Sequence, residues 1–251
     1  VPLHGHSHFS LLRGVGSPAA LAARAAELGY AALALTDRDA LYGAVQFQKA
    51  CRQHGLTPIF GVELTVEPPP ERGPAAAHVT LLAMDRTGYG NLCRLVSRAR
   101  LACAKGEARL PFAALAEHAR GLFCLSGPSA SGEVAQLLRA GRRRAAARAA
   151  ACYREVFGER FFLEIQCHGL PDDQWLAAEL AALGQELRVP LVATADVHYP
   201  RPEDRPLQDV VTGIRTKTTL SEPSPERLPN GQFFLPSPDE FTRRFRHYPE
   251  A

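Results

Sequence analysis

The sequence predicts an α/β fold in which strands and helices alternate around one parallel sheet, either open or closed into a barrel. Two observations support this prediction. Short apolar runs recur along the chain, and most of them are separated by stretches with helical periodicity and helix-capping residues. A length of 251 residues is enough for one large α/β domain or two small ones.

The first half of the chain contains four predicted strands. A short strand over residues 1–6 precedes a helix over residues 17–29, in which Ser17 suits the N-cap, Pro18 the first turn and Gly29 the C-terminal stop. The further elements of this half are strands over residues 30–37, 57–66 and 78–84 and a helix over residues 40–55.

In the second half of the chain, predicted strands and helices alternate up to about residue 200 and not beyond. Beyond residue 200 the chain is rich in proline and contains only short amphipathic pieces. We therefore expect a barrel or sheet domain over residues 1–200 and a C-terminal exit segment over residues 201–251. The predicted strands of this half are residues 121–127, 160–169 and 190–199, and the predicted helices are residues 88–104, 111–119, 132–139, 141–157 and 171–187.

The composition argues against several classes of protein. The chain is 46% hydrophobic and 22% charged with a net charge of +3, so it is ordinary globular material and not a polycation. No membrane partner is expected, because no apolar run reaches the ~18–20 residues of a membrane span and no signal segment is recognisable. Six cysteines without Cys-x-x-Cys spacing favour a reduced, cytoplasmic setting. The Arg-rich run over residues 139–148 fits a solvated helix face better than a phosphate contact.

Imidazole and carboxylate side chains gather where the predicted strands end. In folds with parallel strands, functional groups collect at the carboxyl ends of the strands. His4 and His6 alternate, so both rings point to one face, and Asp196 and His198 mirror them at the end of the last predicted strand. The first and last strands would be neighbours in a closed barrel, and such donors suit Zn, Mn or Fe. The competing interpretation of a lone His pair is a solvated strand end.

Ordered segments along the whole chain resemble the PHP (polymerase and histidinol phosphatase) domain of bacterial C-family DNA polymerases, the family of DNA polymerase III alpha subunits. The segments TDR and RPLQDVVTGIRTKTTL look closer to the error-prone branch of that family. The resemblance implies a distorted seven-stranded (β/α)7 TIM-like barrel with up to three metals in a cleft. The segments that carry it are LHGHSHFSLLRG, ALTDRDALYGAVQFQKA, IFGVEL, HVTLLAMDRTGYGNLCRL, YREVFGERFFLEIQCHGLPDD and LVATADVHYPRPED, followed by QFFLPSPDEF, which is similar to the family segment leading to the polymerase palm.

The resemblance also implies which residues hold the first two metals. The second metal would share Glu63 and use His78, together with a cysteine or histidine at a position that is Pro128 here. His78 opens a predicted strand, which is the wrong end for the carboxyl-end rule. The first metal has all of its implied ligands, which are His4, His6, Glu63 and Asp196.

The resemblance implies a third site made of an acid or histidine closing the first motif, the histidine of Thr-Asp-His and the last histidine. It keeps only His198, because its other two positions are Arg13 and Arg38. A guanidinium stays protonated and has no lone pair to give, so it cannot bind a metal. Two guanidiniums would supply about the charge of a dication in a form that pairs with phosphate. We expect both in the cleft near His198, with Asp37 or Asp196 as the nearest carboxylate. Asp37 itself is expected to stabilise a turn.

Three functions follow as expectations. The favoured one is the N-terminal PHP domain of a DNA polymerase III alpha subunit that structurally supports DNA synthesis. It would bind one divalent metal, at most two, and its partners would be DNA, the palm, fingers and thumb domains and possible repair or replication subunits. The alternative is an active metal-dependent phosphoesterase of the proofreading 3′–5′ exonuclease kind. The third is a free-standing phosphatase of the histidinol-phosphatase kind. No catalytic residue is assigned, and the polymerase carboxylates would lie in other domains.

Overall fold

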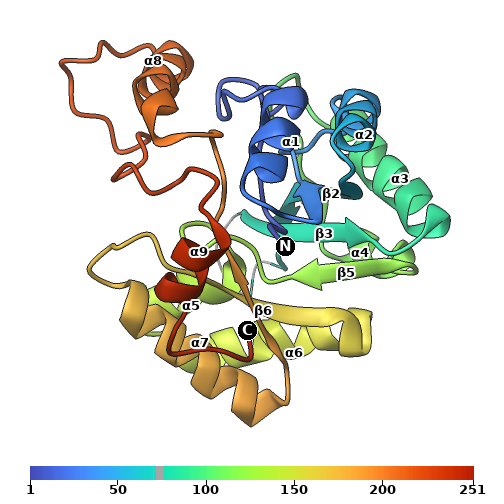
Figure 1. Ribbon diagram of the computed structural model, residues 1–251. Helices are drawn as coiled ribbons and strands as arrows, with labels where there is room; N and C mark the ends of the chain where they lie inside the picture. Colours follow the sequence, from blue (N-terminus) through green and yellow to red (C-terminus); the bar gives the residue numbers. More distant parts are fainter. Residues whose placement is uncertain (70, 72–75) are drawn as a thin grey trace.

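The computed structural model describes residues 1–69, 71 and 76–251. One curled sheet in this part of the chain is flanked by helices on both sides (Figure 1). The strands are β1 (Ala32–Leu35), β2 (Thr57–Glu67), β3 (Ala77–Ala83), β4 (Leu110–Pro111), β5 (Leu122–Leu125), β6 (Phe161–Gln166) and β7 (Leu191–Thr194). The α-helices are α1 (Pro18–Glu27), α2 (Ala44–Gln53), α3 (Arg86–Ala102), α4 (Ala113–Glu117), α5 (Glu133–Arg139), α6 (Arg143–Phe157), α7 (Asp173–Leu187), α8 (Arg205–Thr216) and α9 (Pro238–Arg244), with short 3₁₀ turns at η1 (Gly158–Arg160) and η2 (Pro202–Asp204).

The sheet runs in the order β1-β2-β3-β5-β6-β7, with β4 paired to β2. The predicted α/β class is confirmed, but the prediction of an entirely parallel sheet was wrong, because β3 is antiparallel to both β2 and β5. The reason is the connection between β2 and β3, residues 68–76, which is too short for the crossover that a parallel neighbour needs.

Residues 1–6 close the sheet without forming the predicted strand. Gly5 makes a β-bridge to Val197, and His6 N donates to the Val197 carbonyl at 2.7 Å. On the other side, Thr36 N donates to the Gly5 carbonyl at 2.8 Å. This segment therefore lies between β1 and the end of β7, so the predicted neighbourhood of the first and last segments is confirmed.

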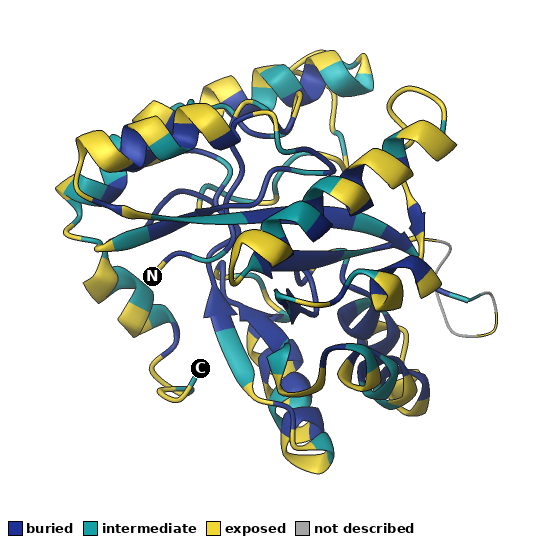
Figure 2. Ribbon diagram, turned by 90° about the vertical axis from the view of Figure 1, so that its right-hand side faces the viewer, coloured by how far each residue is buried: buried dark blue, intermediate teal, exposed yellow. Residues whose placement is uncertain are grey.

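Local signals set several element ends as predicted. The Ser17 side chain accepts a hydrogen bond from Ala20 N at 3.0 Å, Pro18 opens α1, and Gly29 follows it with a φ of +79°. Buried residues fill the strands and the inner faces of the helices, while the outer helix faces are exposed (Figure 2). No helix in the described part of the chain combines the length and the apolar character that crossing a membrane requires.

The C-terminal segment returns to the barrel after α8. His198 N donates to the Phe233 carbonyl at 2.8 Å, and Leu235 N donates to the Tyr199 carbonyl at 3.2 Å. Leu235 and Tyr199 are both fully buried. The segment thus packs beside the end of β7, next to the residues that carry the candidate site.

Candidate metal centre

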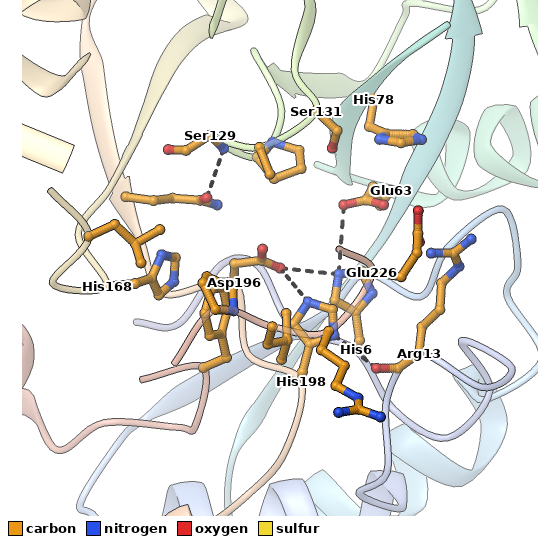
Figure 3. A pocket seen from close by; sticks show the side chains of 18 of the residues that line it. His6, Arg13, Glu63, His78, Ser129, Ser131, His168, Asp196, His198 and Glu226 are labelled. Carbon is orange, nitrogen blue, oxygen red and sulfur yellow. Dashed lines mark hydrogen bonds and ion pairs between the residues drawn. The ribbon is translucent and has the colours of Figure 1, made fainter. Parts of the chain in front are cut away.

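Four of the predicted site residues meet at one end of the barrel. His4, His6, Glu63 and Asp196 are all buried, and one ligand atom from each lies within 4.8 Å of the others. Three of them, His6, Glu63 and Asp196, also line a cavity of about 550 Å³ (Figure 3). The side chains come from segments that are far apart in the sequence and that only barrel closure brings together.

The backbone explains why these side chains converge. His4 and His6 flank the bridged Gly5, so their side chains leave the closing segment on the same face. Glu63 lies in β2, and its main chain is tied to the loop after β1 by a hydrogen bond from Asp39 N at 2.8 Å. Asp196 follows β7 with a φ of +43°, a left-handed conformation that aspartate tolerates better than most residues.

The spacing of the donor atoms fits a single ion. Two donors that are each about 2.1 Å from one metal lie roughly 3–4 Å apart. His4 Nε2 lies 3.2 Å from Glu63 Oε2 and 3.9 Å from Asp196 Oδ1. His6 Nε2 lies 3.7 Å and 3.3 Å from the same two oxygens. Asp196 Oδ1 is buried, and its nearest donors in the described part of the chain are the Nε2 atoms of His6 and His198, each 3.3 Å away and without good hydrogen-bond geometry, which suits an oxygen that binds a cation.

Each histidine is held through its Nδ1 atom. His4 Nδ1 lies 2.6 Å from the Glu164 carboxylate, and His6 Nδ1 lies 3.1 Å from the Ser10 hydroxyl. His198 Nδ1 donates to the Arg13 carbonyl at 2.9 Å. The Nε2 atoms of all three rings therefore face the cluster, and a hydrogen-bonded Nδ1 of this kind is typical of metal-binding histidines. His198 Nε2 lies 3.3 Å from Asp196 Oδ1, at the edge of the four-residue group.

Sequence reasoning missed Glu164, which is fully buried in β6. Its carboxylate accepts hydrogen bonds from Thr194 Oγ1 at 2.5 Å and from Gln166 Nε2 at 3.0 Å, besides its contact with His4. The available signal was a lone acidic residue in the apolar run FFLEIQ, because an unpaired charge is almost never buried. Gln166 also accepts from Ser129 N at 2.8 Å, which connects the network to the loop after β5.

The carboxylates of the site stay ionised despite burial. Burial opposes ionisation, but Arg38 and His4 hold the pKa of Glu63 well below its usual range, and His198 and His6 do so for Asp196. Burial also lowers the pKa of His4, yet the surrounding carboxylates, led by Glu164, raise it well above its ordinary value overall. The buried carboxylates therefore make this site favourable for positive charge.

His78 and Arg38 face each other beside this cluster. His78 is the second residue of β3, and because β3 is antiparallel this end lies at the carboxyl edge of the neighbouring strands. The Arg38 guanidinium contacts the His78 ring and lies 3.3 Å from Glu63 Oε1. Burial, reinforced by Arg38 and Arg13, lowers the pKa of His78 to about 4, so its ring is neutral.

The expectation that Asp37 or Asp196 would be the carboxylate nearest the arginines was wrong for Arg38, whose partner is Glu63. Asp37 is occupied elsewhere, because it accepts from Ser7 N and from the Ser10 hydroxyl, both at 2.7 Å. Asp37 was expected to stabilise its own turn, but its carboxylate instead holds the turn at residues 7–10, which lies 27–30 residues earlier in the chain. Through Ser10, the same carboxylate also helps to orient His6.

Arg13 lines the cavity without a partner for its charge. Its guanidinium has no hydrogen bond or ion pair within residues 1–69, 71 and 76–251. Burial and then the charges of Arg38 and Arg215 lower the pKa of Arg13 to about 10. Five arginines line the same cavity, and Arg215 pairs with Glu226 at 2.8 Å; the other four are Arg13, Arg38, Arg139 and Arg227.

Comparison with known proteins identifies the family. The family model for the PHP domain matches residues 2–168. The chain belongs to the PHP domain family. As a PHP domain it is 40% identical over its whole length to the DNA polymerase III alpha subunit of Treponema pallidum and, again with full coverage, 40% identical to the error-prone DNA polymerase of Symbiobacterium thermophilum. It spans 22% and 24% of the lengths of those two relatives.

A solved structure supports the PHP fold. An amidohydrolase from Chromobacterium violaceum superimposes with a TM-score of 0.56, covering 79% of this chain and 87% of that protein. The two sequences are 17% identical, so this likeness concerns the fold alone. The predicted PHP barrel is thereby confirmed as an architecture.

Proposed function

We propose that the chain is the N-terminal PHP domain of a bacterial DNA polymerase III alpha subunit of the error-prone type, with structural support of DNA-directed DNA synthesis as its main role. The observation that carries this proposal is the combination of polymerase similarity along the whole chain with a site that has one complete ligand set. Residues 1–200 would form the barrel, and residues 201–251 would lead toward a polymerase palm.

The complete ligand set would hold one divalent ion, such as Zn, Mn or Fe, through His4, His6, Glu63 and Asp196. His198 flanks this set, and a second ion would be held weakly through Glu63 and His78, because Arg38 already contacts both. A bound ion supplies Lewis acidity toward a phosphate oxygen. A phosphodiesterase that uses two or three metals clamps both the attacking and the leaving oxygen, and a single ion does not. The proposal therefore favours a structural role over an active exonuclease.

Arg13 and Arg38 would stand in for the third metal and bind a phosphate-type oxyanion. Their guanidiniums border the same cavity as the ligand set, and Arg13 has no partner of its own among the described residues. Charge-assisted pairing with phosphate is the usual role of such a guanidinium. The implied partners are DNA and the remaining polymerase domains. A cytoplasmic location fits these partners and the free thiol state of all six cysteines.

Metal content and nuclease activity, measured on the same preparation, test the proposal. Elemental analysis after dialysis should give about one equivalent of transition metal or less, because only one ligand set is complete. Incubation with single-stranded DNA and Mn or Zn should give little or no degradation. Three equivalents of metal would contradict the replacement of the third site by arginines. Robust digestion that His4→Ala abolishes would establish the phosphoesterase alternative.

A further inference from the structure

A second cavity of about 570 Å³ adjoins the metal-centre cavity and shares Arg13 and Arg38 with it. Its other walls come from the loop after His6 and from the C-terminal end of α3 with the turn that follows. We call it the basic groove and define it by the residues Phe9, Leu11, Arg13, Arg38, Arg100 and Lys105. The groove therefore opens at the surface and continues to the candidate metal centre.

Positive charge exceeds negative charge in the basic groove. Asp39 also lines it and offsets one cation, because the hydrogen bonds that its two carboxylate oxygens accept from Thr65 at 2.8 Å come from neutral donors and leave its charge in place. Glu107 lies 3.6 Å from Arg109 and is paired there. In the described part of the chain, Arg13, Arg100 and Lys105 are left without a carboxylate partner. The Nε of Arg100 donates to the Asp39 carbonyl, a neutral group, at 2.6 Å.

Apolar and aromatic surfaces border these unpaired cations. Leu11 is 66% exposed, and it lines the groove together with the partly exposed Phe9. The Arg100 guanidinium lies over the ring of Tyr42, 5.1 Å from its centroid, and this ring is 53% exposed. A cationic track beside flat apolar surfaces matches single-stranded nucleic acid, whose phosphates need positive charge and whose unpaired bases need stacking surfaces. A lone phosphate or a mononucleotide would use only the Arg13 and Arg38 end.

We infer that the basic groove binds a single-stranded polynucleotide along its backbone and directs one end of the strand toward the metal centre. This inference rests on the proposed function, since a polynucleotide is the ligand that a DNA polymerase domain encounters, and it deepens that function by assigning a binding track. Arg100 and Lys105 would contact internal phosphates. Arg13 and Arg38 would hold the phosphate nearest the metal.

Fluorescence anisotropy with a labelled twelve-residue oligothymidylate and the 251-residue chain tests the inference. The double variant R100A/K105A should bind the oligonucleotide about tenfold more weakly at low salt, because two phosphate contacts are lost. Its plot of log affinity against log salt should be shallower by about 1.4, at ~0.7 for each lost contact with a single strand. K105A alone, which removes an exposed side chain, should show about half of that change in slope and guards against misfolding of the double variant.

The matched control is R142A/R144A, which removes two exposed arginines from the Arg-rich run near the start of α6. It should leave both the affinity and the slope unchanged. No binding by the unmodified chain, or equal losses in the groove variant and the control, would overturn the inference. Metal titration of the same samples separates failure of the groove inference from failure of the proposed function. If the chain binds metal but the groove variants bind the oligonucleotide as the unmodified chain does, only the groove inference is refuted. If the chain binds no metal, the proposed metal centre is refuted.

Discussion

Glu164 orients His4 through the 2.6 Å contact between its carboxylate and His4 Nδ1. The substitution Glu164→Gln keeps the size of the side chain and removes its charge. We expect metal affinity to fall about 10- to 100-fold, because the imidazole loses the carboxylate that fixes its orientation and raises its basicity. Titration against a competing chelator measures the change. Glu159→Gln, at an exposed carboxylate of η1, should bind metal as the unmodified chain does, and equal affinity of the two variants would contradict the assigned role.

The ligand positions at the residue scale could be expected from the sequence, whereas their supporting contacts could not. The His4 and His6 alternation and the resemblance to a known family name four residues that the fold does bring together. Glu164 meets His4 across the barrel interior, 160 residues away in the chain, whereas Ser10 contacts His6 from the same segment, four residues away. The contact of Glu164 depends on tertiary packing, and neither residue belongs to a local pattern that marks a ligand.

Exchange of the two arginines tests whether they occupy the place of a third metal. The double substitution R13D/R38H restores the family's implied ligands beside His198 and should add one tightly bound metal equivalent. R38H alone should not do so, because the Arg13 guanidinium still repels a cation at that place. Calorimetric titration with Zn or Mn counts the sites in both variants. A double variant that gains no metal site, or a single variant that gains an equally tight one, would contradict the claim that Arg13 and Arg38 occupy the place of the third metal.

At the scale of elements, the direction of β3 decides what His78 can do. The alternation of strands and helices predicted the α/β class, but it assigned a parallel direction to every strand and so placed His78 at the wrong edge. The informative feature was the absence of a helical stretch between residues 66 and 78, since a parallel neighbour requires a crossover of a dozen residues or more. With β3 reversed, His78 reaches the carboxyl edge, where it meets Arg38.

Docking of the C-terminal segment on the barrel depends partly on Tyr30, whose hydroxyl donates to the Pro236 carbonyl at 2.9 Å. Tyr30→Phe should lower the free energy of unfolding by about 1 kcal/mol, the usual net contribution of one hydrogen bond. Burial, aided by Glu240, raises the pKa of Tyr30 to about 12. A phenol whose pKa is higher in the folded chain stabilises the fold fully below its ordinary pKa of ~10, and this contribution is lost as the pH rises through about 12.

Urea unfolding at neutral pH and between pH 9 and 12 measures both effects of Tyr30→Phe. The unmodified chain should exceed the variant in free energy of unfolding by about 1 kcal/mol at neutral pH. This difference in free energy should shrink as the pH approaches 12. Tyr42→Phe, which removes an exposed hydroxyl, is the matched control and should change neither quantity. A difference for Tyr30→Phe that does not depend on pH would mean that the phenol is not shielded in the fold.

At the scale of the whole molecule, the contacts that close the barrel also bring the residues of the candidate site together. The segment that carries His4 and His6 pairs on one side with the loop after β1 and on the other with the residues after β7. Glu63 and Asp196 reach the same point from β2 and from the end of β7. A metal bound by all four residues would join the first segment of the barrel to its last, so it should oppose opening of the closed sheet.

Thermal unfolding with and without metal tests this coupling. At a concentration about 100 times its Kd, an ion that binds only the folded chain stabilises it by about 2.7 kcal/mol. For a chain of this size, that energy raises Tm by roughly 5–10 °C. Excess chelator should remove the increase. His6→Ala should not respond to metal, because one of the four donors and its position at the closing segment are lost. His8→Ala, at an exposed histidine of the same segment, should respond fully. An equal metal-induced increase in Tm for His6→Ala would mean that the stabilising ion binds elsewhere. Loss of the metal-induced increase in His8→Ala would mean that the ion binds at the exposed surface of this segment.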